Sequence, residues 1–200
     1  MQKEKLNKVW MAQVATTRLG AVNARFNVEL ARQIAGTLPP GHIYQFGYPS
    51  NILLGAGIPD LPIEMAASRL ENKSMQTNHP FELSELQNLV FAMQCPLAVF
   101  RSATRIGRYV VMTEIKHKGE NFVVAIQTNK RKARIEINDI RSLYPKNNVA
   151  AAGWIIDGLL NYADKKRVVE WLSKQRSNSA EVRKLFNHAT KIVQNFETPK

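Results

Sequence analysis

The hydrophobic residues of this chain change their spacing twice, and this change restricts the fold more than any other feature of the sequence. Before residue 96 they recur every three or four positions, as Phe26, Leu30 and Ile34 do, which is the spacing of one helix face. Between residues 97 and 140, short runs rich in valine, isoleucine and aromatic residues indicate strands. After residue 148 the helical spacing returns. The pattern predicts an α+β protein in which helices flank a central antiparallel sheet.

The sheet itself is predicted from runs of residues separated by turn signals. The four runs are 97–100, 108–116, 121–128 and 133–140. Lys118-Gly119 and the basic segment 129–132 mark two of the turns. We therefore expect a four-stranded antiparallel meander.

The residues before this sheet are predicted to be mainly helical. A helix over residues 4–35, with a break near Gly20, is followed by strand-like runs at 42–46 and 61–65. A short helix is expected over residues 66–72.

Several helix starts are marked by side chains that cap helices. Ser50, Asp164 and Ser179 each precede a helical run, and Ser84 with Gln87 forms a capping-box pattern. The helix after Ser179 has a hydrophobic stripe that is typical of a packing face. We interpret residues 1–172 as one domain, with 1–25 as a helical lead-in, and residues 173–200 as a C-terminal helical extension.

The charge of the chain indicates what it binds. Lys and Arg number 28 against 16 Asp and Glu, which gives a formal net charge of +12 and a pI of about 10.0. Such a field attracts polyanions, so nucleic acid, an anionic membrane or an acidic protein are the candidate partners. The sequence has no apolar run of the roughly 18–20 residues that a membrane span needs, and no secretory signal pattern. No segment stands out as an amphipathic helix with an exposed aromatic face, so we expect no membrane contact.

The residue types exclude several chemistries. The single cysteine, Cys95, lies in an apolar stretch, and we expect it to be buried and inert. The four histidines lack the spacing of metal ligands, and Gly55-Ala56-Gly57 lacks the other residues of a nucleotide loop. We therefore expect neither a metal nor a cofactor.

Lone polar residues near the ends of predicted elements are the candidates for chemistry. His79 precedes a predicted helix, and histidine exchanges protons near neutral pH, although a histidine before a proline is more often a loop or capping residue. Lys73 is available to supply charge, and a serine such as Ser142 is more often a turn hydroxyl than a catalytic one. Further polar residues follow the first and last predicted strands, and they would converge if those strands were neighbours. They are Arg101, Ser102, Thr104, Arg105, Asn138, Arg141 and Tyr144.

Five blocks in this region have the order and spacing of a known family. They are GIPDLPI at 57–63, then Lys73 with HPF at 79–81, PLAVFRS at 96–102, NDIRSLYPK at 138–146, and Trp154-Ile155 with LLNY at 159–162. Over about residues 26–172 the chain resembles the C-terminal domain of phage MuF-type head proteins. Such domains also occur on mobile-element and polymorphic-toxin proteins, and they are classed with the barnase, EndoU, colicin and RelE-like (BECR) nucleases.

The resemblance implies N-terminal helices on a four-stranded antiparallel sheet and a ribonuclease toxin that works without a metal. Lys73 and His79 match the family's lysine and histidine, and Ser102 matches the hydroxyl that ends the Pro-x-x-Val-Phe strand. The remaining matches are Asn138, Ser142, Tyr144 and Tyr162.

We expect an endoribonuclease that attacks RNA, with tRNA as one candidate, through the 2′-hydroxyl and leaves a 2′,3′-cyclic phosphate. His79 would be the general base or acid, Lys73 and Arg141 the stabilising cations, and Ser102 and Ser142 the hydroxyl donors. The expected substrate contacts are Arg101, Arg105, Asn138, Tyr144, Lys146 and Tyr162.

Two other functions remain as alternatives: a non-catalytic nucleic-acid-binding module, and a structural protein of a phage or mobile element. For a toxin we expect an acidic immunity protein as a partner, because the net charge would attract it. We expect such a toxin to act in the cytoplasm of the producing or a target bacterial cell, delivered as an effector or by phage.

Overall fold

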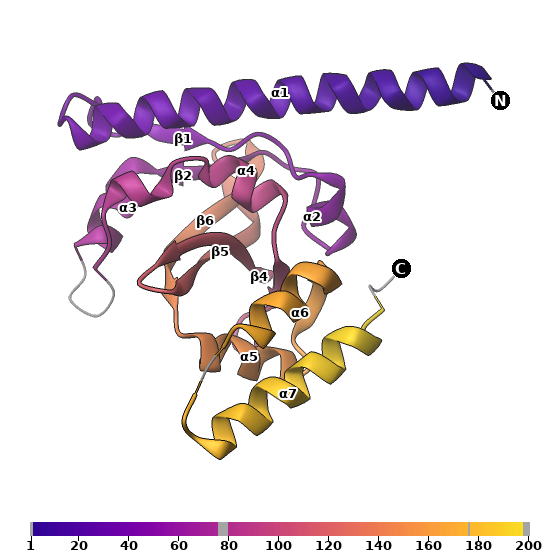
Figure 1. The fold of residues 1–200 in the computed structure, drawn as a ribbon. Coiled ribbons are helices and arrows are strands. Elements are labelled where there is room, and N and C mark those ends of the chain that lie inside the picture. The colour runs from indigo at the N-terminus through magenta and orange to yellow at the C-terminus, as the bar shows by residue number, and fades with distance from the viewer. Residues whose placement is uncertain (1, 76–79, 176, 198–200) are drawn as a thin grey trace.

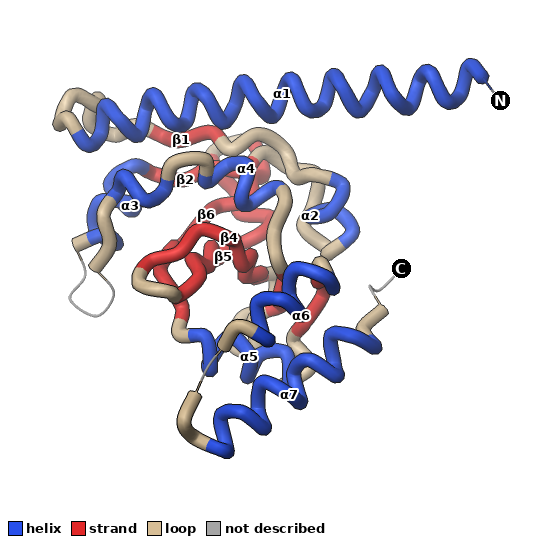
Figure 2. Tube along the Cα trace, in the orientation of Figure 1, coloured by secondary structure: helices blue, strands red, loops and turns tan. Residues whose placement is uncertain are grey.

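A seven-stranded sheet forms the centre of the molecule (Figure 2). The computed structural model describes residues 2–75, 80–175 and 177–197, with side chains from residue 18 onward. The strands are β1 (Ile43–Gln45), β2 (Ile63–Ala66), β3 (Ala98–Arg101), β4 (Arg108–His117), β5 (Glu120–Lys132), β6 (Ile135–Lys146) and β7 (Leu160–Ala163).

The strand order is β1-β2-β6-β5-β4-β3-β7, and every pair is antiparallel except β2 with β6. The α+β class is confirmed. The expectation of a four-stranded sheet is wrong, because β1, β2 and β7 extend the predicted β3–β6 meander at both edges. The parallel pair aligns Ile63 with Asn138 and Glu64 with Asp139, and it joins residues 75 positions apart in the chain.

Helices cover the sheet on two sides (Figure 1). The helices on the first side are α1 (Gln2–Ile34), α2 (Asn51–Gly55), α3 (Ala67–Ser74), the 3-10 helix η1 (Leu83–Leu86) and α4 (Leu89–Gln94). Those on the second side are α5 (Asn148–Ile156), α6 (Lys165–Ser173) and α7 (Ala180–Asn195).

Helix α1 runs without interruption through Gly20, so the predicted break is wrong. A glycine inside a helix costs about 1 kcal/mol relative to alanine. Around it, Leu19, Val22, Phe26 and Leu30 pack against the core of the first side, and this packing outweighs the cost of the glycine.

Three of the predicted caps are confirmed. The side chains of Ser50, Asp164 and Ser179 each accept a hydrogen bond from a backbone N–H of the first helical turn. The capping box before η1 uses Glu82 and Glu85, two residues earlier than the Ser84 and Gln87 pattern indicated.

Strand β5 continues through the basic segment 129–132, which was predicted to be a turn. The chain reverses instead between Lys132 and Ile135, and Ala133 takes a positive φ of 53° there. A register irregularity near Asn129, whose φ is 51°, absorbs the mismatch between β5 and β6. Pairing with β6 over residues 130–132 therefore extends this hairpin beyond the length expected from the sequence.

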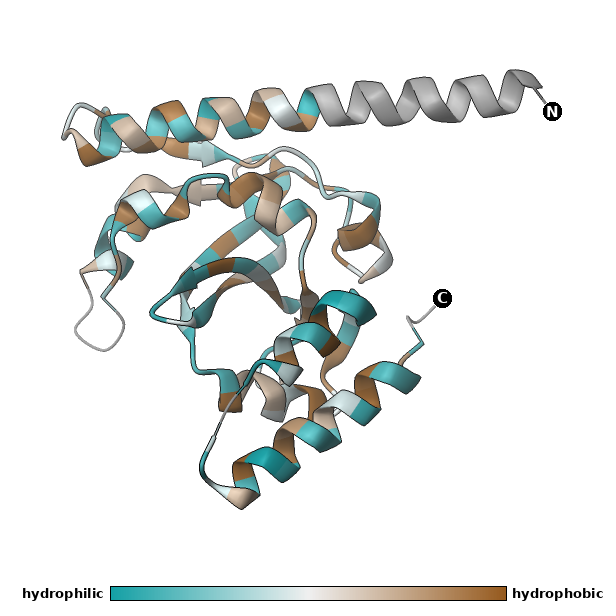
Figure 3. Cartoon of the chain, in the orientation of Figure 1, coloured by the Kyte–Doolittle hydropathy of each residue, from teal (hydrophilic) through white to brown (hydrophobic). Residues whose placement is uncertain are grey.

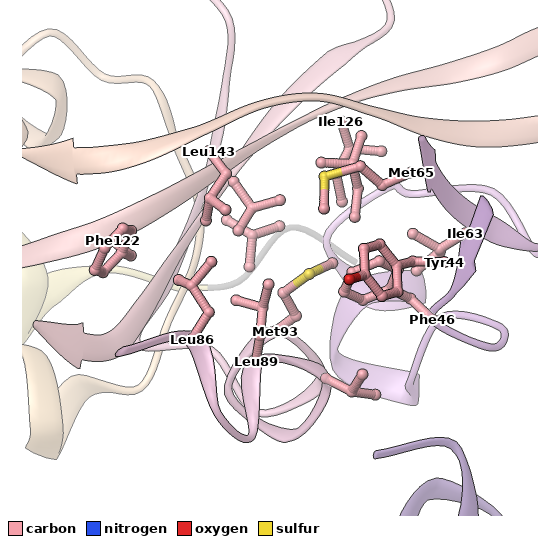
Figure 4. Close-up of a cluster of buried hydrophobic side chains, with 14 of the residues drawn as sticks. Tyr44, Phe46, Ile63, Met65, Leu86, Leu89, Met93, Phe122, Ile126 and Leu143 are labelled. Atoms are coloured by element: carbon pink, nitrogen blue, oxygen red, sulfur yellow. The ribbon is translucent and has the colours of Figure 1, made fainter. Parts of the chain in front are cut away.

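The first hydrophobic core lies between the sheet and helices α1 to α4. Figure 4 shows its side chains from strands and helices pointing toward one another. They include Tyr44, Phe46, Ile63, Met65, Leu86, Leu89, Met93, Phe122, Ile126 and Leu143.

The second core lies between the sheet and helices α5 to α7. Along α7, hydrophobic and hydrophilic residues alternate (Figure 3), and Phe186, Ala189 and Val193 are the buried ones. The hydrophobic stripe after Ser179 is thus a packing face, as predicted. The two cores use opposite faces of the same strands, since Val124 of β5 is in the first and Val123 in the second.

Candidate nucleic-acid interface

The face of the sheet opposite α1 has an apolar part and a polar part. Where α5 to α7 pack on it, this face is apolar, with Phe100, Val110 and Val123 in the second core. Elsewhere on the same face a polar row crosses five strands in register. Its members are Gln45, Glu64, Asp139, Gln127 and Arg108.

Alternation along the strands places these polar side chains on that face. In β2, the neighbours Ile63 and Met65 are in the first core, so Glu64 points the other way. Further cations gather around the polar row from α3, β5 and β6. We call the whole group the basic face, and its charged members are Arg69, Arg108, Lys130, Lys132 and Arg141 with the carboxylates Glu64 and Asp139.

Asp139 is the centre of this group. Its side chain is only 6% exposed, and it contacts cations from three elements. Lys130 Nζ lies 2.7 Å from Oδ2, Arg141 Nη1 2.9 Å from the same oxygen, and Arg69 Nη1 3.0 Å from Oδ1. Burial alone would raise the pKa of this carboxyl, but the hydrogen bonds from Lys130, Arg141 and Arg69 outweigh it and lower the pKa.

Glu64 is the second buried carboxylate of the basic face. Lys132 Nζ lies 2.6 Å from its Oε2, and Gln45 Nε2 donates to its Oε1 at 3.1 Å. The lysine comes from the far end of β5, so this ion pair ties the β5–β6 hairpin to β2. Each carboxylate holds flexible cationic side chains in defined positions on the sheet.

A β-bulge directs Arg141 onto the basic face. Ala125 pairs with Ser142 and Ile126 with Ile140, so two consecutive residues of β5 face three of β6. Ile140 stays in the first core, and the extra residue, Arg141, is exposed and contacts Asp139.

Arg108 is the cation of the basic face with a vacant hydrogen-bonding position. Its Nε is buried and has no hydrogen-bond partner among the described residues. Desolvation is the main cause that lowers the pKa of Arg108, and the nearby charges of Arg105 and Arg141 lower it further. Like charges held together in this way favour an anion between them.

The β3–β4 loop forms a hollow beside Arg108. It is lined by Arg101, Ser102, Ala103, Thr104, Arg105, Ile106, Gly107, Arg108 and Tyr109. The Ser102 and Thr104 hydroxyls lie 3.4 Å apart, and Arg101 donates to the carbonyl of Gly158. Hydroxyls and guanidinium groups together are suited to hold phosphate oxygens.

Gly107 anchors this loop to β5. Its carbonyl accepts from the Thr128 N–H at 2.8 Å, the Thr128 hydroxyl at 2.9 Å and the Gln127 amide at 3.1 Å. Its φ is 68°, and a Cβ here would lie 3.3 Å from both of those side chains. Glycine is therefore required here both for its φ and for space.

The predicted catalytic residues are only partly brought together. His79 lies outside the described residues, and Lys73 is in the last turn of α3. Ser102 follows β3, whereas Arg141 and Ser142 are on β6. The expected convergence of these strand ends is wrong, because β4 and β5 separate β3 from β6. Three strand spacings correspond to about 14 Å, so one phosphodiester cannot contact both Ser102 and Ser142.

The predicted substrate contacts also divide into two groups. Arg101 and Arg105 are exposed near the basic face. Asn138, in contrast, is fully buried and donates to the carbonyls of Pro59 and Leu61, so it cannot contact RNA in this structure. Its amide instead fixes the loop before β2.

Three more predicted contacts have packing roles. Tyr144 packs on the second core and Tyr162 on the first, and burial raises the pKa of both phenols. Lys146 lies over the ring of Trp154, 4.7 Å from its centroid, beside the second core. These residues lie away from the polar row that the strands build.

Sequence reasoning missed Arg69, Arg108, Lys130, Glu64 and Asp139. One signal was present, because Asp139 directly precedes Ile140 in a predicted strand and is buried there with Asn138. The expectation for Cys95 is wrong, since the thiol is exposed after α4. Cys95 is the residue that ends α4, and it reaches the surface there although the stretch around it is mainly apolar.

The described histidines do not join the basic face. His42 lies 3.1 Å from Glu29 of α1, and His117 lies 2.8 Å from Glu85 of η1, both on the side of the first core. In the part of the chain that the structure describes, no group of three or more His, Cys, Asp or Glu side chains is arranged to hold a metal ion. Nor is any described helix long and apolar enough to span a membrane.

The fold and the site define an α+β domain with a charged sheet face. Residues 70–170 match the model of the family described as the phage MuF C-terminal domain, and the chain belongs to this family. The match runs from α3 into α6, a narrower range than the residues 26–172 expected from the sequence blocks. No curated protein and no solved structure matches the chain.

Proposed function

We propose that the basic face binds the phosphate backbone of RNA and that the domain is an endoribonuclease that needs no metal. The observation that carries this proposal is the grouping of five cations around two carboxylates on a part of the sheet that is otherwise polar. A surface with an excess of positive charge binds polyanions and orients them.

The contacts of the basic face support phosphate binding in particular. Lys130, Lys132 and Arg141 are 40–47% exposed while they contact carboxylates, so they can bind a phosphate without leaving those partners. Arg108 brings a guanidinium whose Nε has no partner within the described structure. Charge-assisted bonds from guanidinium groups to phosphate are among the stronger hydrogen bonds in proteins.

The proposed cleavage is a transfer of the phosphoryl group within the RNA. A base removes the proton of the ribose 2′-hydroxyl, the 2′-oxygen bonds to phosphorus, and the bond from phosphorus to the 5′-oxygen breaks. An acid gives a proton to the leaving 5′-oxygen, which leaves a 2′,3′-cyclic phosphate. In this proposal Arg108 and Arg141 stabilise the charge that develops on the phosphate.

The proton-transfer role stays assigned to His79, with Lys73 as an additional cation. In the sequence, His79 lies between α3 and η1. Its proposed role in proton transfer rests on the chemistry of imidazole. Because Ser102 and Ser142 are too far apart to act on one phosphate, we assign Ser102 to the loop hollow and Ser142 to the basic face.

Cleavage of labelled RNA in the presence of EDTA tests this proposal. We expect cleavage to persist, to leave cyclic phosphate ends, and to be lost in His79→Ala but not in His188→Ala, whose exposed histidine lies on α7. Cleavage that stops in chelator would contradict the metal-free mechanism. Unchanged cleavage by His79→Ala would remove that residue from the mechanism.

The same basic face supports a second candidate function, a nucleic-acid-binding module without catalysis. It predicts RNA binding with a steep salt dependence and no cleavage under any condition. A structural phage protein, which family membership suggests, would bind a protein partner and have no affinity for RNA at moderate salt.

The biological setting remains part of the proposal. We propose tRNA as a candidate substrate, and an acidic immunity protein that covers the basic face of the toxin. Action in the cytoplasm of a bacterial cell, after delivery as an effector or by phage, follows from the same proposal.

A further inference from the structure

Two isoleucines are exposed at one end of the sheet. Ile106, in the β3–β4 loop, is 102% exposed, and Ile135, at the start of β6, is 55% exposed. Both project where a soluble domain ordinarily places polar residues. Neither belongs to either hydrophobic core.

Strand register brings the two segments to the same end of the sheet. Arg108, the residue that follows the loop, pairs with Gln127 of β5. Strand β5 continues from there to Lys132, so the β5–β6 hairpin projects past the loop. The loop is fixed to β5 through Gly107, as described above, so both segments are held by the same strand.

Exposed cations flank both isoleucines. Arg105 precedes Ile106, and Arg131, Lys132 and Arg134 surround the hairpin turn next to Ile135. Isolated aliphatic side chains among positive charges are unsuited to a hydrophobic protein interface, whose centre is depleted of charge. They suit a partner that offers anionic groups and flat apolar surfaces at short intervals.

Nucleic acid with unpaired bases is such a partner. In a duplex the base faces are stacked on one another, and an A-form helix presents mainly phosphates and 2′-hydroxyls to a protein. In an unpaired segment the base faces are open to side chains. Aliphatic side chains that insert between the stacked bases of a duplex must first unstack them, at a cost of a few kcal/mol, and unpaired bases avoid this cost. Ile106 and Ile135 would then bury apolar surface while the cations contact phosphates.

We propose that the β3–β4 loop and the β5–β6 hairpin select unpaired RNA over duplex RNA, with Ile106 and Ile135 packing against bases. This inference rests on the proposed function and assigns its substrate class. The basic face supplies affinity for any RNA, and the two isoleucines supply the preference for unpaired segments.

Binding of 2′-O-methyl RNA tests the inference, because this RNA lacks the attacking hydroxyl and stays intact. The probes are one labelled 2′-O-methyl strand without internal pairing and the same strand annealed to its complement. The variants are Ile106→Ser, Ile135→Ser and both together in the full chain. The controls are Val28→Ser and Ile34→Ser, which replace exposed aliphatic residues of α1.

We expect Ile106→Ser and Ile135→Ser each to weaken binding of the unpaired strand about fivefold, and the double variant about twentyfold. Each substitution removes part of the apolar surface that one isoleucine buries against a base. Duplex binding and the slope of affinity against salt should not change, because no charge is removed. The control variants should bind both RNAs as the wild type does.

Three results would overturn the inference, and they have different meanings. The assignment of unpaired RNA is refuted if the isoleucine variants bind the unpaired strand as the wild type does, or if their affinities for the unpaired strand and the duplex fall equally. Either result leaves binding by the basic face intact. A wild-type chain that binds neither RNA at moderate salt refutes the proposed function itself. Because both isoleucines are exposed, thermal unfolding should confirm that each variant is folded.

Discussion

Replacing Asp139 by asparagine removes the charge around which the basic face is built. The substitution keeps the size of the side chain and leaves Lys130, Arg141 and Arg69 without their common counter-ion. Asparagine can still accept hydrogen bonds through its single amide oxygen, but its NH2 group would face cationic donors. The cations would then repel one another across the space that the carboxylate occupied.

The expected loss in the free energy of unfolding is about 2 kcal/mol near neutral pH. Removing one partner of a buried ion pair costs about 3–5 kcal/mol, because the remaining charge is left uncompensated. Here the carboxylate is 6% exposed, but Lys130 and Arg141 are 40% exposed and can regain water. Solvent screening therefore places the loss below the range for a fully buried pair.

The loss should depend on pH in a defined direction. The pKa of Asp139 in the folded chain is lowered relative to the unfolded chain, where an aspartate has a pKa of about 3.9. The stabilisation is therefore fully present above that value and is lost as the pH falls through the lower folded pKa. The difference between the wild type and Asp139→Asn should shrink over the same pH interval.

Urea unfolding at neutral and acidic pH measures both effects. Glu114→Gln is the matched control, because Glu114 is 66% exposed and contacts only Arg167 among the described ion pairs. We expect this control to cost at most about 1 kcal/mol. If Asp139→Asn is as stable as the wild type at neutral pH, or if the difference grows on acidification, the carboxylate of Asp139 does not stabilise the fold through its ion pairs.

Three further results are expected. Gly107→Ala should lower the melting temperature more than Gly119→Ala, because both have a positive φ but only the Cβ at position 107 is crowded; equal losses would contradict this. Arg108→Gln should reduce the slope of log affinity for RNA against log salt by about one, and Arg183→Gln on α7 should leave the slope unchanged. Cys95 should react with a thiol reagent in the folded chain, and a reaction that needs denaturant would mean that the thiol is buried.

The sequence was a good guide to the elements whose signals are local. Helices α5, α6 and α7, the meander β3–β6 and the caps at Ser50, Asp164 and Ser179 follow from spacing and from side chains next to the helix start. In each case the residues that determine the element lie within about one or two turns of it.

The strand-like runs at 42–46 and 61–65 correctly indicated β1 and β2, but the place of the short edge strands in the sheet could not be found in this way. Strands β1, β2 and β7 contain three or four residues each, and their pairing depends on distant parts of the chain. The parallel pairing of β2 with β6 leaves no turn signal between the two strands, unlike a hairpin. Asn138 illustrates the consequence, because its burial depends on the loop before β2 and not on its own neighbours.

The candidate site was predicted only in part for the same reason. Arg101, Ser102, Arg105 and Arg141 were selected because they lie at strand ends, and they do lie around the basic face. The partners that organise this face come from α3, β2 and β5, and only the register brings them together. A search along the sequence cannot detect a row of side chains that runs across the strands.

The bulge in β6 places one extra residue, Arg141, between two residues that pair with consecutive residues of β5. If Arg141 were deleted, Ile140 and Ser142 would face Ile126 and Ala125 as consecutive pairs, and the ladder would become regular with the same inward-facing residues. The pairing of β5 with β6 therefore does not need this position, and the side chain found there is an exposed cation that contacts Asp139. A variant that lacks Arg141 should therefore still fold. Its RNA binding, compared with that of the wild type, would separate the residues needed for folding from those needed for function.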